Sequence, residues 1–137
     1  MDYDLNRFLK AQERDYAQAL SEIREGQKRS HWIWYIFPQM RGLGHSYMSE
    51  FYGIADEEEA RQYLAHPVLG ARLREISAAL LELPQNDPSR VMGWPDDKKL
   101  CSCMTLFERV AEPGSVFSQV LERYYGGKRD AATLRML

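Results

Sequence analysis

The stretch HWIWYIFPQ, residues 31–39, decides the fold class of this chain. A short apolar run that ends at a proline can form either a buried strand or a buried helix. Ser30 precedes the run and belongs to a residue type that commonly caps a helix N-terminus, and no other segment supplies a convincing strand partner. We therefore predict a short buried helix here and an all-α fold for the chain.

Outward from this stretch, apolar residues recur at helical spacing. Residues 4–26 predict one or two helices, with Asp4 able to cap the N-terminus and Gly26 able to end the segment. The longest stripe begins after Pro67, which suits the first turn of a helix. Its members are spaced by 4, 3, 4 and 3 positions: Leu69, Leu73, Ile76, Leu80 and Leu83. Such a stripe buries one helix face in a core.

Residues 56–66 predict a further helix, because they begin with a capping pattern. Asp56 and Glu59 are spaced so that each side chain can satisfy a free amide of the first helical turn. The residue before a proline avoids the helical region, so this helix should end near His66.

The C-terminal half follows the same pattern. Residues 84–90, PQNDPSR, contain two prolines and predict a loop. Apolar stripes predict helices over residues 100–110 and 116–125, and the second of these ends at a glycine pair. Asp130 can cap a short last helix.

The composition is that of an ordinary folded domain. With 137 residues, 45% of them hydrophobic and 28% charged, the chain can bury a core, and we expect a compact single multihelical domain over residues 1–137. The net charge of -2 comes from 18 Lys plus Arg against 20 Asp plus Glu, with no long basic block. We therefore expect no nucleic-acid partner.

Further features of the sequence bear on location and cofactors. Cys101 and Cys103 are too close along a helix to form a disulfide, and free thiols are typical of a reducing compartment. No apolar run approaches the roughly 20 residues of a membrane-spanning helix, and the N-terminus is too acidic and polar for a signal peptide. The histidines lack metal-ligand spacing. We expect a cytoplasmic protein with no membrane partner, no metal site and no cofactor.

Polar residues around the aromatic stretch are candidates for a functional site. His31 lies where the apolar run begins, so it could be a general base or a ligand anchor, or simply hydrogen-bond at the helix start. Trp32 and Trp34 could stack a planar ligand, although such residues are more often core. The segment RGLGHS, residues 41–46, could offer backbone amides and the Arg41 guanidinium to a phosphate or carboxylate, or be a plain turn.

A second set of candidates lies in PDDKKLCSCMTLF, residues 95–107. Lys98, Ser102 and Thr105 share one helix face. Lys99 lies one turn before Ser102, and a lysine near a serine could activate a nucleophile or bind an anion. The alternative is that the aspartates cap the helix and the lysines are solvated.

Five motifs together resemble a bacterial family of unknown function, catalogued as domain of unknown function 1810 and sometimes labelled calpastatin-like. They are SHWIWYIFPQMRGLGHS, FYGI, YLAHPVLGARL, PDDKKLCSCMTLF and GKRDAATLRML. The resemblance runs from about Leu5 to the C-terminus and implies a small multihelical protein. The calpastatin label has no support in the residues, because calpain inhibitors are disordered and this chain has the composition of a protein with a core.

The resemblance also implies which residues matter. The family pattern emphasises polar, aromatic and turn-forming positions that match His31, Trp32, Trp34, Gln39, Gly42, Gly44, Ser46, Asp97, Lys99, Ser102, Thr105 and Asp130. This chain departs from the pattern at Lys98, where the family has an apolar residue, and at Cys103, where it more often has a serine. These departures weaken any claim that those two positions are catalytic.

Two functions from different classes remain open. The first is a small-molecule pocket, and its most concrete form is a hydrolase acting on a nucleotide-like or ADP-ribose-like compound. The catalytic candidates are His31, Asp97, Lys99 and Ser102. The ligand-binding candidates are Trp32, Trp34, Gln39, Arg41, Gly42, Gly44, Ser46 and Thr105. The second function is a non-catalytic interaction or dimerisation module, with Tyr47, Phe51 and Tyr52 on its surface, in a protein that is a monomer or a homodimer.

The first hypothesis carries an expectation about location. The end of the aromatic stretch and the start of the 95–107 segment each combine apolar residues with a polar edge. Two such polar edges can line one solvent-filled cavity only if they lie next to each other. We therefore expect His31 and either Lys99 or Ser102 to face one cavity.

Overall fold

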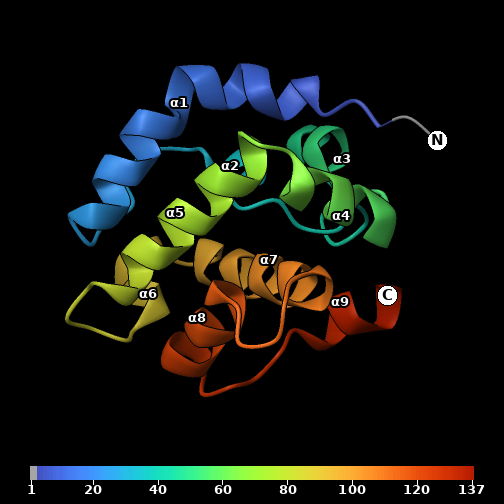
Figure 1. Cartoon of the computed structure of the whole chain (residues 1–137). Helices are drawn as coiled ribbons and strands as arrows, with labels where there is room; N and C mark the ends of the chain where they lie inside the picture. Colours follow the sequence, from blue (N-terminus) through green and yellow to red (C-terminus); the bar gives the residue numbers. More distant parts are fainter. Residues whose placement is uncertain (1–2) are drawn as a thin grey trace.

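The computed structural model describes residues 3–137, and over this range the chain forms nine α-helices and no strand (Figure 1). The helices are α1 (Asn6–Arg24), α2 (Ile33–Ile36), α3 (Tyr47–Tyr52), α4 (Glu57–Ala65), α5 (Leu69–Leu81), α6 (Pro88–Met92), α7 (Asp96–Val110), α8 (Val116–Tyr125) and α9 (Ala131–Met136). The all-α prediction is confirmed. None of the helices between residues 3 and 137 combines the length and the apolar character that a membrane span requires.

Helix α7 lies at the centre of the arrangement. It packs against α4, α6, α8 and α9 and touches α2, while α1 packs on α5 and α2 (Figure 1). Its predicted apolar stripe is fully buried at Leu100, Cys103, Met104 and Phe107. All five members of the predicted stripe at 69–83 are buried as well. Periodicity alone therefore identified the two helix faces that make the middle of the core.

The corner between α4 and α5 is tight. Helix α4 ends with His66 as its C-cap, as predicted. A Cβ added to Gly70, in the first turn of α5, would lie 2.0 Å from the carbonyl oxygen of Leu64, so only glycine fits this approach. Pro67 lies in the turn before α5 and not in its first helical turn, because Val68 takes the N-cap position.

The helix starts follow the capping preferences only in part. Side chains cap five helices, those of Ser46, Asp56, Asp87, Ser115 and Asp130. The predictions that Asp4 caps α1 and Ser30 caps α2 are wrong, because Leu5 and Trp32 hold those N-cap positions without a side-chain bond. Helix α3 was not predicted, and α6 occupies the second half of the segment 84–90 that was predicted as a loop.

The aromatic stretch does contain a short buried helix, α2, and one buried carboxylate fastens its start to α1. Glu22 is 1% exposed. It accepts hydrogen bonds from Gln18 Nε2 at 2.7 Å, the Arg29 and Ser30 amides at 2.7 and 2.9 Å, Ser30 Oγ at 2.6 Å and Trp32 Nε1 at 3.0 Å. Burial by itself raises the pKa of this carboxyl, but the hydrogen bonds outweigh burial and lower the pKa to about 2. Glu22 is therefore ionised at neutral pH and holds this junction together.

Beyond α2 the chain runs beside the α3–α4 connection. The Ile54 amide donates to the Gln39 carbonyl at 2.9 Å, and the Arg41 amide donates to the Ile54 carbonyl at 2.8 Å. These bonds form an isolated parallel bridge between Met40 and Ile54. They fix the backbone that carries the Gln39 side chain.

Candidate functional site

A hollow of about 270 Å³ opens where the α2–α3 connection meets the starts of α7 and α9. We call it the Gln39 hollow, and its walls are formed by Gln39, Leu43, Gly44, Pro95, Lys98, Lys99, Ser102, Asp130 and Ala132. Four residues predicted as site residues lie in these walls: Gln39, Gly44, Lys99 and Ser102.

The spacing along α7 brings its wall residues together. Lys98, Lys99 and Ser102 follow Pro95 by three, four and seven positions, so all four share one helix face. The apolar stripe of α7 occupies another face and is buried against neighbouring helices. The local sequence therefore decides that these polar side chains lie at the edge of the core.

Lys99 contributes positive charge to the wall. Asp96 lies between two ammonium groups: its Oδ2 is 2.8 Å from Lys28 Nζ and its Oδ1 is 3.7 Å from Lys99 Nζ. The Lys28 side chain is only 6% exposed, whereas Lys99 reaches the hollow. Because one carboxylate serves two cations, and the closer of the two is Lys28, Lys99 is left incompletely neutralised.

Each of these lysines also lies over a tryptophan of the aromatic stretch. Lys28 Nζ is 4.8 Å from the ring centroid of Trp32, and Lys99 Nζ is 5.1 Å from the ring centroid of Trp34. Both distances are those of a cation–π contact. The α2 segment and the first turn of α7 are thus linked by two cations that flank one aspartate.

The hydroxyl of Ser102 hydrogen-bonds to the carboxylate of Asp130, which also lines the hollow. This hydroxyl lies 3.1 Å from Asp130 Oδ2 and 3.2 Å from the Lys98 carbonyl, and Ser102 is 7% exposed. The same Asp130 Oδ2 accepts bonds from the Thr133 amide at 3.1 Å and the Thr133 hydroxyl at 2.5 Å. Within residues 3–137 no histidine or lysine side chain hydrogen-bonds to Ser102, so the predicted activation of this serine by a neighbouring lysine has no hydrogen bond to support it.

Asp130 itself presents one free oxygen. Its Oδ2 takes three donors, whereas no group in the described part of the chain donates to its Oδ1. The Asp130 amide donates to Thr105 Oγ1 at 2.9 Å, which ties the start of α9 to α7. A carboxylate held on one oxygen and free on the other can accept a hydrogen bond from a hydroxyl group in the hollow.

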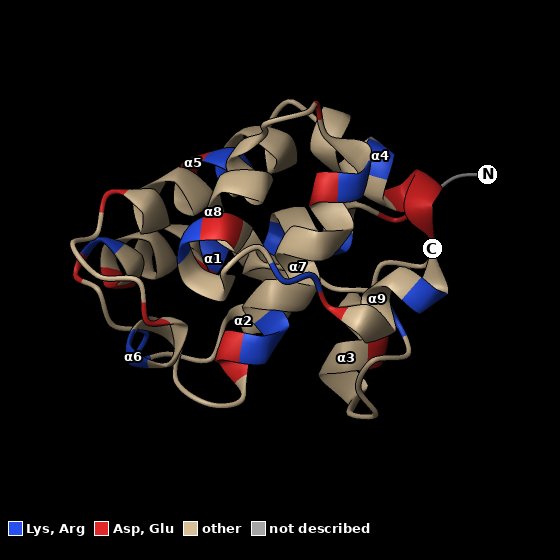
Figure 2. Ribbon diagram, turned by 90° about the horizontal axis from the view of Figure 1, so that it is seen from below, with Lys and Arg blue, Asp and Glu red and all other residues tan. Residues whose placement is uncertain are grey.

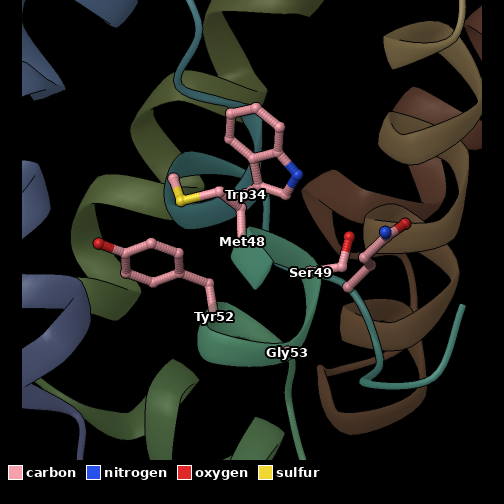
Figure 3. Close-up of a pocket in the computed structure, with 6 residues that line it drawn as sticks. Trp34, Met48, Ser49, Tyr52 and Gly53 are labelled. Carbon is pink, nitrogen blue, oxygen red and sulfur yellow. The ribbon is translucent and has the colours of Figure 1, made fainter. Parts of the chain in front are cut away.

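A small chamber adjoins the Gln39 hollow and shares Gln39 with it. It has a volume of about 10 Å³ and is lined by Trp34, Gln39, Met48, Ser49, Tyr52 and Gly53 (Figure 3). Trp34 Nε1 is buried and has no hydrogen-bond acceptor within residues 3–137. In Figure 3 the indole nitrogen points away from Met48 and Tyr52, toward the side on which Ser49 lies. A buried donor without an acceptor costs about 1–3 kcal/mol, and an acceptor atom on a ligand or a water in the chamber would remove this cost.

The glycine turn after the aromatic stretch lines the Gln39 hollow and packs against Ser49, a residue of the chamber wall. A Cβ added to Gly44 would lie 2.4 Å from Ser49 Oγ, so the turn packs against α3 without room for a side chain. Ser46 Oγ caps α3 by accepting from the Ser49 amide at 3.2 Å. The turn therefore shapes the wall of the site, and its backbone conformation is set by packing.

The remaining candidates lie elsewhere. His31 is exposed and lines neither the Gln39 hollow nor the chamber. At the end of the aromatic stretch it is Gln39, and not His31, that faces the same hollow as Lys99 and Ser102. Trp32 is 1% exposed and bonded to Glu22, and Thr105 is 1% exposed. The guanidinium of Arg41 donates to the carbonyls of Glu50 and Gly53, both at 3.1 Å. Exposed Gly42 and Ser46 also lie outside both hollow and chamber.

Asp97 belongs to a second hollow, which adjoins the Gln39 hollow because Lys98 and Asp130 line both. This hollow, which we call the Tyr125 hollow, has a volume of about 460 Å³. Its walls are formed by Pro88, Asp97, Lys98, Cys101, Tyr125, Lys128, Arg129, Asp130 and Ala131. Figure 2 shows adjacent acidic and basic residues at the start of α7 and a basic stretch in the chain that leads into α9. Burial, with a contribution from Asp130, raises the pKa of the Cys101 thiol to about 11, so this thiol is protonated at neutral pH.

Several residues that build the two hollows had no distinguishing sequence signal. Lys28, which pairs with Asp96, stands in a charged segment just after α1 and cannot be told from a solvated lysine in the sequence. Lys128 could have been suspected from the GKRD motif that follows α8, because that motif is part of the family resemblance, whereas Tyr125 lies outside it. No group of three or more His, Cys, Asp or Glu side chains in residues 3–137 is arranged to hold a metal ion.

Comparisons with known proteins give relatives of this chain. Residues 2–137 match the family described as "Protein of unknown function (DUF1810)". The crystal structure at 1.38 Å of the conserved hypothetical protein Rv1873 from Mycobacterium tuberculosis is 44% identical in sequence, with a TM-score of 0.96. The match covers 98% of this chain and 96% of that chain. No curated protein matches the sequence.

Proposed function

The chain belongs to the DUF1810 family of proteins of unknown function, and from that premise we propose a function on the geometry of its site. The Gln39 hollow binds a small anionic ligand of the nucleotide-like or ADP-ribose-like class. The family name supplies no reaction, so the proposal rests on the groups that line the hollow.

The observation that carries the proposal is the charge arrangement at Lys99. Two ammonium groups share the Asp96 carboxylate, and the buried one, Lys28, is the closer. The Lys99 ammonium group is therefore incompletely neutralised, and it lines the hollow together with the Gln39 amide. An ammonium and an amide donor suit phosphate or carboxylate oxygens, which accept hydrogen bonds.

The opposite wall suits a different part of such a ligand. Asp130 Oδ1 accepts no hydrogen bond from the rest of the described chain, and a free carboxylate oxygen pairs with a hydroxyl donor. A cation on one side and an acceptor on the other match a phosphorylated sugar, which carries both anionic oxygens and hydroxyls. This supports the nucleotide-like or ADP-ribose-like class over a simple carboxylic acid.

Hydrolysis is the finer form of the proposal and has less support than binding. Neither His31 nor Asp97 lines the Gln39 hollow, and the hydroxyl of Ser102 is committed to hydrogen bonding. Asp130 is the carboxylate that lines it, so a hydrolytic reaction would use Asp130 to orient a substrate hydroxyl or a water. Chromatography of ADP-ribose incubated with the protein tests this form, and unchanged ADP-ribose after prolonged incubation would leave binding alone.

Binding is tested by isothermal titration with ADP-ribose. Lys99→Met and Gln39→Ala each remove one polar contact, worth about 1–3 kcal/mol, so each should weaken affinity by roughly 5- to 150-fold. Lys10→Met is the matched control, because Lys10 is an exposed lysine on α1 outside both hollows. Equal affinities of the three variants would remove the assignment of the site. Absence of binding by the unaltered protein at millimolar ADP-ribose would remove the proposed function.

The alternative, a non-catalytic interaction or dimerisation module, has one observation in its favour. Tyr47 is 74% exposed and Phe51 is 42% exposed, and their rings stack with centroids 5.7 Å apart. Tyr52 differs, because it packs inward against Phe8 and Tyr35. A second copy of this chain is the simplest partner for such a pair. Sedimentation velocity tests it: a dimer that Tyr47→Ala with Phe51→Ala converts to a monomer supports the alternative, and a monomer at all concentrations ends it.

A further inference from the structure

The two hollows adjoin, because Lys98 and Asp130 line both of them. We call these two residues the shared wall. Along α7, Lys99 faces only the Gln39 hollow and Cys101 faces only the Tyr125 hollow. The start of α9 repeats this division, because Ala132 lines the first and Ala131 the second. The hollows are therefore neighbours, with the side chain of Lys98 shared between them.

Hydrogen bonds hold Asp130 of the shared wall in place against α7. Ser102 Oγ lies 3.1 Å from Asp130 Oδ2, and Thr105 Oγ1 accepts from the Asp130 amide at 2.9 Å. Both bonds join α7 to the chain that leads into α9. The distance between the two hollows is thus set by the fold, which favours a ligand of fixed span.

The walls of the Tyr125 hollow differ in chemistry from those of the Gln39 hollow. The Tyr125 hydroxyl donates to the Asp97 carbonyl at 2.5 Å, which fixes the ring, and Pro88 and Ala131 add apolar surface. Cys101 contributes a neutral thiol. A fixed aromatic ring beside small apolar groups is the kind of wall on which a planar heterocycle stacks.

Three cations, Lys98, Lys128 and Arg129, line this hollow together with two carboxylates, those of Asp97 and Asp130. Arg129 is paired with Glu108. For Lys98 and Lys128, by contrast, no carboxylate within residues 3–137 forms an ion pair with the ammonium group. These two lysines are available to the oxygens of a phosphate group.

From these observations we propose that the Tyr125 hollow is a second subsite for the same ligand, and this inference rests on the proposed function. The Gln39 hollow takes a sugar phosphate, the Tyr125 hollow takes a planar base, and Lys98 binds the diphosphate that joins them. The ligand class is therefore a nucleoside diphosphate linked to a sugar, and a mononucleotide fills only part of the site.

Three probes divide the site into its parts. Ribose 5-phosphate represents the Gln39 hollow, AMP represents the Tyr125 hollow and ADP-ribose spans both. Joining two binding fragments at a fitting distance raises affinity by roughly 10²–10⁴-fold. In isothermal titrations ADP-ribose should therefore bind at least about 100-fold more tightly than either half.

The two neighbouring alanines provide matched variants. Ala131→Leu narrows the Tyr125 hollow and Ala132→Leu narrows the Gln39 hollow, and leucine is a good helix former at both positions of α9. Ala131→Leu should weaken AMP and ADP-ribose by tenfold or more and leave ribose 5-phosphate unchanged. Ala132→Leu should weaken ribose 5-phosphate and ADP-ribose and leave AMP unchanged. Thermal melting of both variants checks that each is folded.

The outcomes separate this inference from the proposed function. If ADP-ribose binds no more tightly than ribose 5-phosphate and Ala131→Leu changes nothing, the second subsite is wrong and the Gln39 site stands. If both variants weaken all three probes equally, the hollows are not separate subsites and the inference is overturned. If none of the probes binds the unaltered protein, both proposals fall.

Discussion

Trp32 and Trp34 stand two positions apart in the aromatic stretch and have opposite surroundings. Trp32 is 1% exposed and donates its indole N–H to Glu22 at 3.0 Å, and both carboxylate oxygens of Glu22 accept further hydrogen bonds. Trp34 is partly exposed, and its buried Nε1 has no acceptor within residues 3–137. A polar cluster that is fully paired stabilises the fold, whereas one with groups left over is available to a ligand.

The charges at the two places differ in the same way. Glu22 takes five hydrogen bonds from α1 and from residues 29–32, so its charge is used inside the protein. At the second place, Asp96 is shared between Lys28 and Lys99, and Lys99 lines an open hollow. Substitutions at the first place should change stability, and substitutions at the second should change binding.

The largest expected effect is at Ile36, a core residue of the same aromatic stretch. This residue is 2% exposed in α2, so Ile36→Ala leaves a cavity and should cost on the order of 2–5 kcal/mol of unfolding free energy. Gln39→Ala, three positions on, should change the unfolding free energy by less than about 0.5 kcal/mol, as for surface substitutions. Urea denaturation measures both. Similar losses for the two variants would show that Gln39 is as structural as Ile36.

Next in size is the loss of the buried charge at Glu22. The pKa of about 2 corresponds to on the order of 3 kcal/mol of stabilisation at neutral pH. Glu22→Gln should lose about this amount, because the NH₂ group of a glutamine would face the N–H and O–H groups that now donate to the carboxylate. The control is Glu25→Gln, since Glu25 is exposed and its pair with Arg29 is a surface ion pair. Urea denaturation at pH 7 compares them, and equal losses would contradict the contrast.

The same carboxylate predicts the acid dependence of stability. Its pKa in the folded protein, about 2, is below its ordinary value of 4.5, so its stabilisation is present above pH 4.5 and is lost as the pH falls toward 2. Between pH 7 and pH 3 the unaltered protein should lose about 2 kcal/mol more than Glu22→Gln does. Parallel stability curves for the two proteins over this range would show that Glu22 is not responsible.

The smallest effect comes from the tryptophan pair itself. Trp32→Phe and Trp34→Phe remove similar volumes, but only the first removes a hydrogen bond, and that bond goes to an ionised carboxylate. Trp32→Phe should therefore cost about 1.5 kcal/mol more than Trp34→Phe. Thermal and urea unfolding measure the difference. A larger cost for Trp34→Phe would mean that its indole N–H has an acceptor in solution.

Much of the fold was predictable because helical periodicity is a local property. The stripe at 69–83, the end of α4 at His66, the end of α8 before Gly126 and the Asp130 cap all follow from residues a few positions apart. The short helix in the aromatic stretch was predicted on other grounds, from Ser30 as a cap and from the lack of a strand partner elsewhere in the sequence. It failed at Ser30, because the hydroxyl that could have capped α2 bonds to Glu22 from the preceding helix.

The candidate site was predictable only in its parts. The sequence by itself determined that Gln39 stands at the polar end of an apolar stretch and that Lys99 and Ser102 stand beside a core stripe. It gave no sign that Glu22 is buried, since a glutamate in a helix reads as a surface residue until the chain turns back over it.

Only the tertiary structure decided which of these parts meet. Lys28 reaches Asp96 and Ser102 reaches Asp130 across long stretches of chain, and His31 is left outside the hollow that Gln39, Lys99 and Ser102 line. The physical reason is that helix faces follow from local spacing, whereas the pairing of distant side chains depends on how the helices pack.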